Sequence, residues 1–158
     1  MQLYIAFQGG EVVYFKAMES VISIKEIGAT LNGILQKRDE FRVVYLFGSL
    51  ARGIISNFSD IDIGVLLNED FVKESAYGYR ADLTAELISL LRTDKIDLVV
   101  LNHAPPLLAH RVVRDGIVLH CKDESERIAF EVRMLNRFSD TAPLRERQNE
   151  YLRKSVLA

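Results

Sequence analysis

Two short polar motifs, each joined to an apolar run, constrain the fold of this 158-residue chain more than any other feature. The first run, residues 43–47, ends in Gly48-Ser49. A second apolar run carries Asp60 and Asp62, with one residue between them. Side chains two residues apart on a strand point to the same side. The two carboxylates are therefore predicted to project together from one face of a β-sheet.

A carboxylate pair in a partly apolar setting predicts a bound cation. Ile61 and Ile63 flank Asp62, and like charges in such a place repel each other unless a cation lies between them. Mg²⁺ prefers oxygen ligands of this kind and takes further ligands from the phosphates of a substrate. Upstream, Gly48-Ser49 offers backbone N–H groups and a hydroxyl at a predicted helix start, which favours phosphate. The two motifs together indicate nucleotide chemistry.

The same residues resemble a known pattern. GSLARG followed by SDIDI is similar to the G-S-x-x-R-G … D-x-D signature of the DNA polymerase beta-type nucleotidyltransferase superfamily. The short chain resembles in particular the minimal nucleotidyltransferases, which are typically encoded beside a HEPN-domain toxin and act as its antitoxin. The resemblance is strong from about Val43 to Leu101 and looser toward the C-terminus. It implies a single nucleotidyltransferase domain at residues 18–158, with residues 1–17 as an N-terminal extension.

The resemblance also assigns roles to individual residues. It implies that Asp60 and Asp62 bind the Mg²⁺ that coordinates the triphosphate of ATP, the usual donor in the family. Asp97, on a third apolar run, would complete a second metal site and accept the proton of the attacking hydroxyl. The nucleotide-binding residues that we predict are Gly48, Ser49, Arg52 and Ser59. Two plainer interpretations stay open: Asp97 pairs with Lys95 at a strand edge, and Arg52 is an ordinary surface arginine.

The hydrophobic pattern predicts one α/β domain with a mixed β-sheet flanked by helices. An N-terminal β-hairpin is expected in residues 1–17, paired with the sheet or with another subunit. Strands are expected at residues 41–47, 61–67, 96–101 and 117–121, and helices at residues 19–38, 49–55, 75–92, 105–114, after 123, and at 144–154. Asp123 is the predicted N-cap of its helix, in which Ile128, Val132 and Leu135 share one apolar face.

Composition narrows the classes of function. A formal charge of −2 argues against a chain whose main task is to bind nucleic acid, although basic residues gather near the C-terminus. No apolar stretch reaches the ~20 residues that span a bilayer. The N-terminus lacks the pattern of a signal peptide, so a cytoplasmic protein is expected. A single cysteine, Cys121, excludes an internal disulfide and is predicted to be a small buried hydrophobe.

The function that these features favour is the transfer of AMP from ATP to a hydroxyl of a HEPN toxin. Two alternatives remain: an antitoxin that neutralises its partner by binding alone, and a nucleotidyltransferase for small molecules. The expected partner-binding surfaces are a charged C-terminal helix and an apolar loop, and homo-oligomerisation is left open. These surfaces comprise Arg145, Arg147 and Arg153 on the helix and Ile54, Ile55 and Phe58 in the loop.

Overall fold

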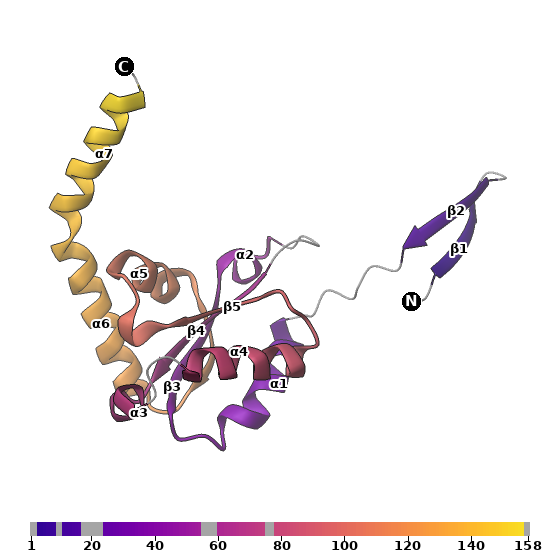
Figure 1. Cartoon of the computed structure of the whole chain (residues 1–158), viewed down its shortest axis with the longest axis horizontal. Coiled ribbons are helices and arrows are strands. Elements are labelled where there is room, and N and C mark those ends of the chain that lie inside the picture. The colour runs from indigo at the N-terminus through magenta and orange to yellow at the C-terminus, as the bar shows by residue number, and fades with distance from the viewer. Residues whose placement is uncertain (1–2, 9–10, 17–23, 55–59, 75–77, 157–158) are drawn as a thin grey trace.

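A four-stranded mixed sheet organises the computed structural model, which describes residues 3–8, 11–16, 24–54, 60–74 and 78–156 (Figure 1). The strand order is β5-β4-β3-β6. The central strand β4 pairs antiparallel with β3 and parallel with β5, and β6 pairs antiparallel with β3. The strands are β3 (Phe41–Phe47), β4 (Ile61–Leu67), β5 (Ile96–Val100) and β6 (Ile117–Cys121). The predicted mixed sheet is confirmed.

Helices cover both faces of this sheet, so its central strands are buried on both sides. On one face, α1 (Ile24–Leu35) and α4 (Gly78–Leu91) contribute to one apolar core. On the other, α5 (Pro106–Asp115) and α6 (Glu124–Asp140) contribute to a second core. The shorter and peripheral elements are α2 (Gly48–Ala51), α3 (Glu69–Glu74), η1 (Leu101–His103) and α7 (Ala142–Val156).

Arg38 fixes helix α4 to the segment that precedes β3. Its guanidinium donates hydrogen bonds to Glu40 Oε1 and Glu86 Oε2, both at 2.6 Å, and to the Tyr79 hydroxyl at 2.9 Å. The Tyr79 hydroxyl in turn donates to Glu40 Oε1 at 3.1 Å. Tyr79 and Glu86 lie about two turns apart on α4, so one arginine holds both the start and the middle of the helix. Charge-assisted bonds of this kind are among the stronger polar contacts in proteins.

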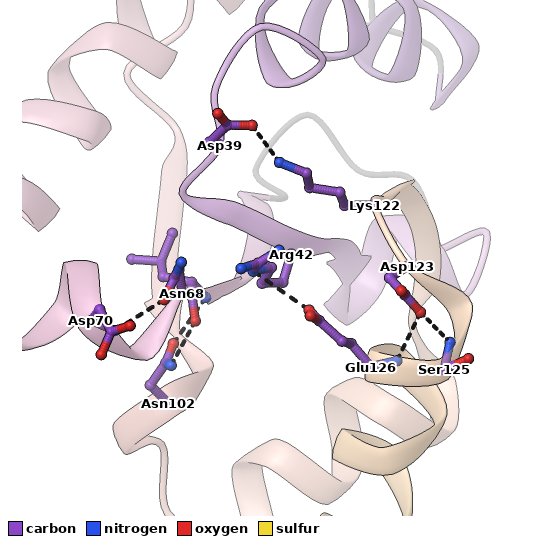
Figure 2. Close-up of polar contacts among 10 residues, drawn as sticks. Asp39, Arg42, Asn68, Asp70, Asn102, Lys122, Asp123, Ser125 and Glu126 are labelled. Atoms are coloured by element: carbon purple, nitrogen blue, oxygen red, sulfur yellow. Dashed lines mark hydrogen bonds and ion pairs between the residues drawn. The ribbon is translucent and has the colours of Figure 1, made fainter.

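All four strands predicted for the main sheet are confirmed, the third ending one residue early, while the short helices differ from the prediction. The helix expected over residues 49–55 is a single turn, and residue 55 lies outside the described part of the chain. Helix α3 was not predicted. Its start is explained by Asn68, whose Oδ1 accepts a hydrogen bond from Asp70 N at 3.0 Å. Figure 2 shows Asn68 beside Asn102. The side-chain amide of Asn102 accepts a hydrogen bond from Leu67 N and donates one to Leu67 O, at the end of β4.

The apolar face predicted for α6 is not the face that contacts the core. Ile128, Val132 and Leu135 do share one side of the helix, but they are 46–52% exposed. Phe130 and Met134, on the other side, are buried instead. The sheet selects this orientation, because α5 and α6 close its second core around the inward side chains of β3.

The N-terminal hairpin forms as predicted but stands apart from the main sheet. Strands β1 (Leu3–Gln8) and β2 (Glu11–Lys16) pair antiparallel in their own two-stranded sheet (Figure 1). Within the described residues, neither strand of the hairpin pairs with the main sheet, which was one of the two possibilities left open by the sequence. The residues that join the hairpin to α1 lie outside the described part, so the division at residues 17 and 18 stays a prediction.

Two expectations from composition can be compared with the structure. Cys121 is half-buried on β6 rather than fully buried, and burial raises the pKa of its thiol, as does the nearby Glu124. A raised pKa disfavours the reactive thiolate. Within the described residues, no helix combines the length and apolar character needed to cross a membrane.

The N-cap of α6 offers a direct test of local structure. The Asp123 carboxylate accepts hydrogen bonds from Ser125 N at 2.7 Å and Glu126 N at 3.2 Å (Figure 2). Asp123→Ala should lower the free energy of unfolding by about 1 kcal/mol in urea titrations, because it leaves these amides without their acceptor. Asp123→Asn keeps an acceptor oxygen and should lower the free energy of unfolding by only a few tenths of that amount. Equal losses in both variants would show that the cap is not the cause.

Candidate active site

The candidate site is built on a close contact between Gly48 and Asp62. Phe47, the last residue of β3, lies opposite Asp62 in the register of β4. Gly48 follows with φ +75°, a backbone conformation that favours glycine. A Cβ atom at Gly48 would lie 1.8 Å from Asp62 Oδ2 and 2.6 Å from its Cγ. Only glycine fits there, and the turn after β3 therefore rests directly against the Asp62 carboxylate.

Asp97 lies beside Asp62 on the neighbouring parallel strand. The two residues are direct partners in the β4–β5 register, so their side chains emerge on the same side of the sheet. The Asp97 side chain is 57% exposed. Asp60 is exposed and directly precedes β4. Adjacent strands thus bring the three predicted carboxylates to one end of the sheet.

The ionisation of Asp62 shows that these carboxylates interact. Burial raises the pKa of Asp62 above the ordinary range for an aspartate, and the negative charges of Asp97 and Asp60 raise it further. The positive charge of Arg52 acts in the opposite direction. The pKa of Asp62 is thus raised by its own burial and by the two neighbouring carboxylates, which shows that the three acids share one electrostatic environment.

The three carboxylates do not converge on a common point. Among the described residues, no three acidic, histidine or cysteine side chains lie close enough together to hold a metal ion. The sequence-based expectation of a convergent trio is thus not met in this arrangement. Asp97 Oδ1 lies 3.9 Å from Arg80 Nη2 of α4.

The predicted phosphate-binding residues are only partly described. Ser49 lies in α2, a single helical turn with no side chain capping its start. Arg52, exposed at the end of α2, is near enough to Asp62 and to Asp115 for its charge to lower the pKa of both carboxyls. Ser59, Ile55 and Phe58 lie outside the described residues. Ile54, at the edge of that gap, is 59% exposed.

Sequence reasoning missed Arg80. This residue lies in the first turn of α4, and its Nε donates a hydrogen bond to Leu98 O on β5 at 3.0 Å. One signal points to it: a cation in the first turn of a helix is unfavourable beside the positive end of the helix dipole, where acidic residues are preferred. The partner on β5 is far away in sequence and is not visible in local patterns.

Comparison with known proteins establishes the family. Residues 29–125 match the family described as "Polymerase beta, Nucleotidyltransferase", which is more than half of the chain. The match includes the Gly48 turn and all three aspartates. The chain therefore belongs to this nucleotidyltransferase family, and the fold and residue pattern agree with that assignment.

Individual relatives place the chain more closely. It is 35% identical over 124 residues to "Protein adenylyltransferase MntA" of Aphanizomenon flos-aquae, which covers 74% of this chain and 81% of the relative. Its fold is similar to a chain in a crystal structure of a toxin–antitoxin with AMP-PNP, with a TM-score of 0.62, 24% identity, and 83% of this chain and 98% of that chain covered. It is also similar to a chain of a complex between the tri-AMPylated Shewanella oneidensis HEPN toxin and an MNT antitoxin, with a TM-score of 0.58, 22% identity, and coverage of 85% and 98%.

Gly48 and Gly53 form a matched pair for testing the site. Both have positive φ, +75° and +74°, but a Cβ at Gly53 would meet no atom within 4 Å. Gly53→Ala should therefore cost only the backbone penalty, about 1 kcal/mol of unfolding free energy. Gly48→Ala should cost more, measured by urea unfolding, because the new methyl group displaces the Asp62 carboxylate.

The double variant provides the control. In an Asp62→Ala background the displaced carboxylate oxygens are gone, so Gly48→Ala should then cost about as much as Gly53→Ala, roughly 1 kcal/mol. A Gly48 cost that does not change in this background would mean that the contact with Asp62 is not what requires glycine.

Proposed function

We propose that this chain is a Mg²⁺-dependent protein adenylyltransferase that transfers AMP from ATP to a hydroxyl of a HEPN-type toxin and so acts as its antitoxin. The observation that carries the proposal is the placement of the Gly48 turn against Asp62, with Asp97 in register on the next strand. This arrangement joins a phosphate-binding turn to a group of carboxylates on adjacent strands. The name of the 35% identical relative, a protein adenylyltransferase, supports the reaction.

The donor set fits Mg²⁺. Asp60, Asp62 and Asp97 offer only carboxylate oxygens, the ligand type that Mg²⁺ prefers. The raised pKa of Asp62 records a repulsion that a cation would relieve. Asp60 and Asp62 would hold one ion and Asp97 would complete a second site. When bound, the metal supplies positive charge to the phosphate oxygens at which negative charge develops during transfer.

The residues of the chain then have distinct tasks. The Gly48 turn allows close approach of a phosphate to the backbone, and the Ser49 hydroxyl donates a hydrogen bond to it. Arg52 and Ser59 are proposed to bind further phosphate oxygens. Asp97 accepts the proton of the attacking hydroxyl. The hydroxyl oxygen forms a bond to the α-phosphorus, the bond from that phosphorus to the β-phosphate bridging oxygen breaks, and pyrophosphate leaves.

A protein partner suits the surfaces that the structure exposes. Helix α7 has no buried residue among its described side chains, and Leu144, Tyr151 and Leu152 are 52–74% exposed. The outer side of α6 adds three more exposed apolar residues, as described above. Exposed apolar patches of this kind mark interaction sites. The similar structures come from toxin–antitoxin complexes, which supports a toxin as the partner.

Arg145, one of the three arginines predicted for the partner-binding surface, makes contacts within the chain instead. The Arg145 guanidinium stacks 3.7 Å from the centre of the Phe138 ring and donates to Phe138 O at 2.6 Å. Arg145 therefore holds α7 against α6, and Arg147 and Arg153 remain as the basic residues that we propose for the partner. Ile54 is the described member of the apolar loop.

A purely binding antitoxin is the second candidate, and the exposed apolar sides of α6 and α7 favour it, since they do not depend on chemistry. The small-molecule alternative has no comparable support from the described surface.

Co-expression separates the two candidates. We expect the HEPN-type protein encoded beside this gene to gain one or more AMP masses with the wild-type chain, measured by intact mass. Asp60→Ala and Asp62→Ala should abolish the gain, because each removes a proposed metal ligand. A partner that gains no AMP mass yet is neutralised equally by all three chains would leave binding alone as the function.

Metal binding can be tested without the partner. Since the pKa of folded Asp62 is raised, its ionised form destabilises the folded state at neutral pH, and stability falls as pH rises through that pKa. Asp62→Asn should therefore melt higher than the wild type at pH 7 without metal. It should also lose most of the stability that Mg²⁺ and ATP together give the folded protein. For the wild type this gain in unfolding free energy is about 2.7 kcal/mol when the ligand is in hundredfold excess over its Kd.

Asp140→Asn, at the exposed end of α6, is the control for this measurement and should keep the full gain with Mg²⁺ and ATP. An unchanged melting shift in Asp62→Asn would count against metal binding at Asp62.

A further inference from the structure

We propose that Arg80 binds an oxyanion of the acceptor, on the side of the site away from the Gly48 turn. The inference rests on the proposed AMP transfer and assigns a residue to its second substrate. It starts from the strand order. Gly48 follows β3, Asp62 lies on β4, and Asp97 lies on β5, the edge strand of the described sheet. Arg80 approaches Asp97 from α4.

This order separates the two substrates. A triphosphate bound at the Gly48 turn lies at the β3 side of the carboxylates. An in-line displacement places the attacking hydroxyl opposite the leaving pyrophosphate. The acceptor must therefore enter from the β5 side, where Asp97 is available to take its proton and where the Arg80 guanidinium lies.

The protein backbone, rather than Asp97, orients Arg80. The bond from Arg80 Nε to Leu98 O is 3.0 Å long, whereas the 3.9 Å between Arg80 Nη2 and Asp97 Oδ1 is too long for a hydrogen bond. The neighbouring Tyr79 is held by Arg38 and Glu40, which fixes the first turn of α4. The guanidinium is thus anchored at one nitrogen while its side chain stays 62% exposed. This is a preorganised, accessible donor.

Local stability does not explain an arginine at this position. No acidic residue lies in the first turn of α4, and Arg80 stands instead beside the positive end of the helix dipole. The Arg80–Asp97 ion pair is long and exposed, so it contributes little to the stability of the fold. Residues that break a local rule without local compensation are concentrated at functional sites. The two nitrogens at the tip of the guanidinium match a carboxylate or a phosphate in geometry and charge.

Two sources supply such an oxyanion on the acceptor. One is a carboxylate next to the acceptor hydroxyl on the partner protein. The other is the phosphodiester that a first AMP transfer leaves on the acceptor, whose ribose hydroxyls can attack the next ATP. Both present the same chemistry to Arg80, and they differ in which round of transfer depends on it.

The test compares Arg80→Ala and Arg80→Lys with the wild-type chain. Each is incubated with ATP, Mg²⁺ and the purified partner, and the AMP additions are followed by intact mass at several partner concentrations. Arg80→Ala should slow transfer at low partner concentration by about tenfold or more, the usual effect of losing a hydrogen bond to a charged group. Saturating partner should restore most of the rate, and Arg80→Lys should restore part of it. Calorimetry should give an ATP affinity within about twofold of the wild type, because the triphosphate lies on the other side of the carboxylates.

Lys37→Ala is the charge-matched control. Lys37 is exposed between α1 and β3, and β3 begins opposite Leu67, at the end of the sheet away from the candidate site. It should behave as the wild type in both measurements.

The outcomes distinguish the alternatives. A defect in the first addition assigns Arg80 to a carboxylate of the partner, and a defect confined to later additions assigns it to the phosphodiester. A rate loss that persists at saturating partner concentration would mean that Arg80 only positions Asp97. Weakened ATP binding would mean that Arg80 contacts the nucleotide instead of the acceptor. Either result overturns the inference, as does unimpaired transfer by Arg80→Ala. A wild-type chain that leaves the mass of the partner unchanged contradicts the proposed function itself, and the inference with it.

Discussion

The contact between Gly48 and Asp62 is the constraint on which the site depends. At this point the chain leaves β3 with positive φ and passes so close to β4 that no side chain fits between the backbone and the carboxylate. The strand register brings this about, because it sets Phe47 opposite Asp62. The two motifs are therefore one structural unit. The glycine allows the turn to pass beside β4, and the turn limits where the carboxylate can lie.

Charge then determines how this unit is arranged. Burial raises the pKa of Asp62, and the negative charges of Asp97 and Asp60 at the same end of the sheet raise it further. Two arginines moderate the repulsion from different elements. Arg52 acts on Asp62 from the end of α2, and Arg80 approaches Asp97 from the first turn of α4. The acidic centre is thus flanked by a cation on the β3 side and another on the β5 side, which matches a reaction between an anionic donor and a second anionic substrate.

The sequence predicted those parts of the structure that depend on local pattern. Continuous apolar runs defined β3 and β4 because strands buried on both faces admit few polar residues. The pattern in α6 was misleading, since its sequence carries one apolar set at Ile128, Val132 and Leu135 and another at Phe130 and Met134. Periodicity detects both sets but does not show which one the sheet covers. The role of Arg80 was equally inaccessible, because its partner on β5 is 18 residues away. The absence of a three-carboxylate cluster among the described residues was missed for a different reason: the family pattern describes the residues of a metal site, not the distances between their side chains.

The exposed apolar side chains of α6 and the turn at Gly48 are linked through α5. The Phe138 ring lies between His110 of α5, stacked at 3.8 Å, and Arg145 of α7 at 3.7 Å. One aromatic side chain therefore joins the last three helices, and α5 also contacts α2, which carries Ser49 at its start. The exposed apolar sides of α6 and α7 are thus separated from the Gly48 turn by a single helix, α5. Because close-packed helices leave little free volume between them, the partner surface and the phosphate-binding turn that we propose lie one layer of helix apart.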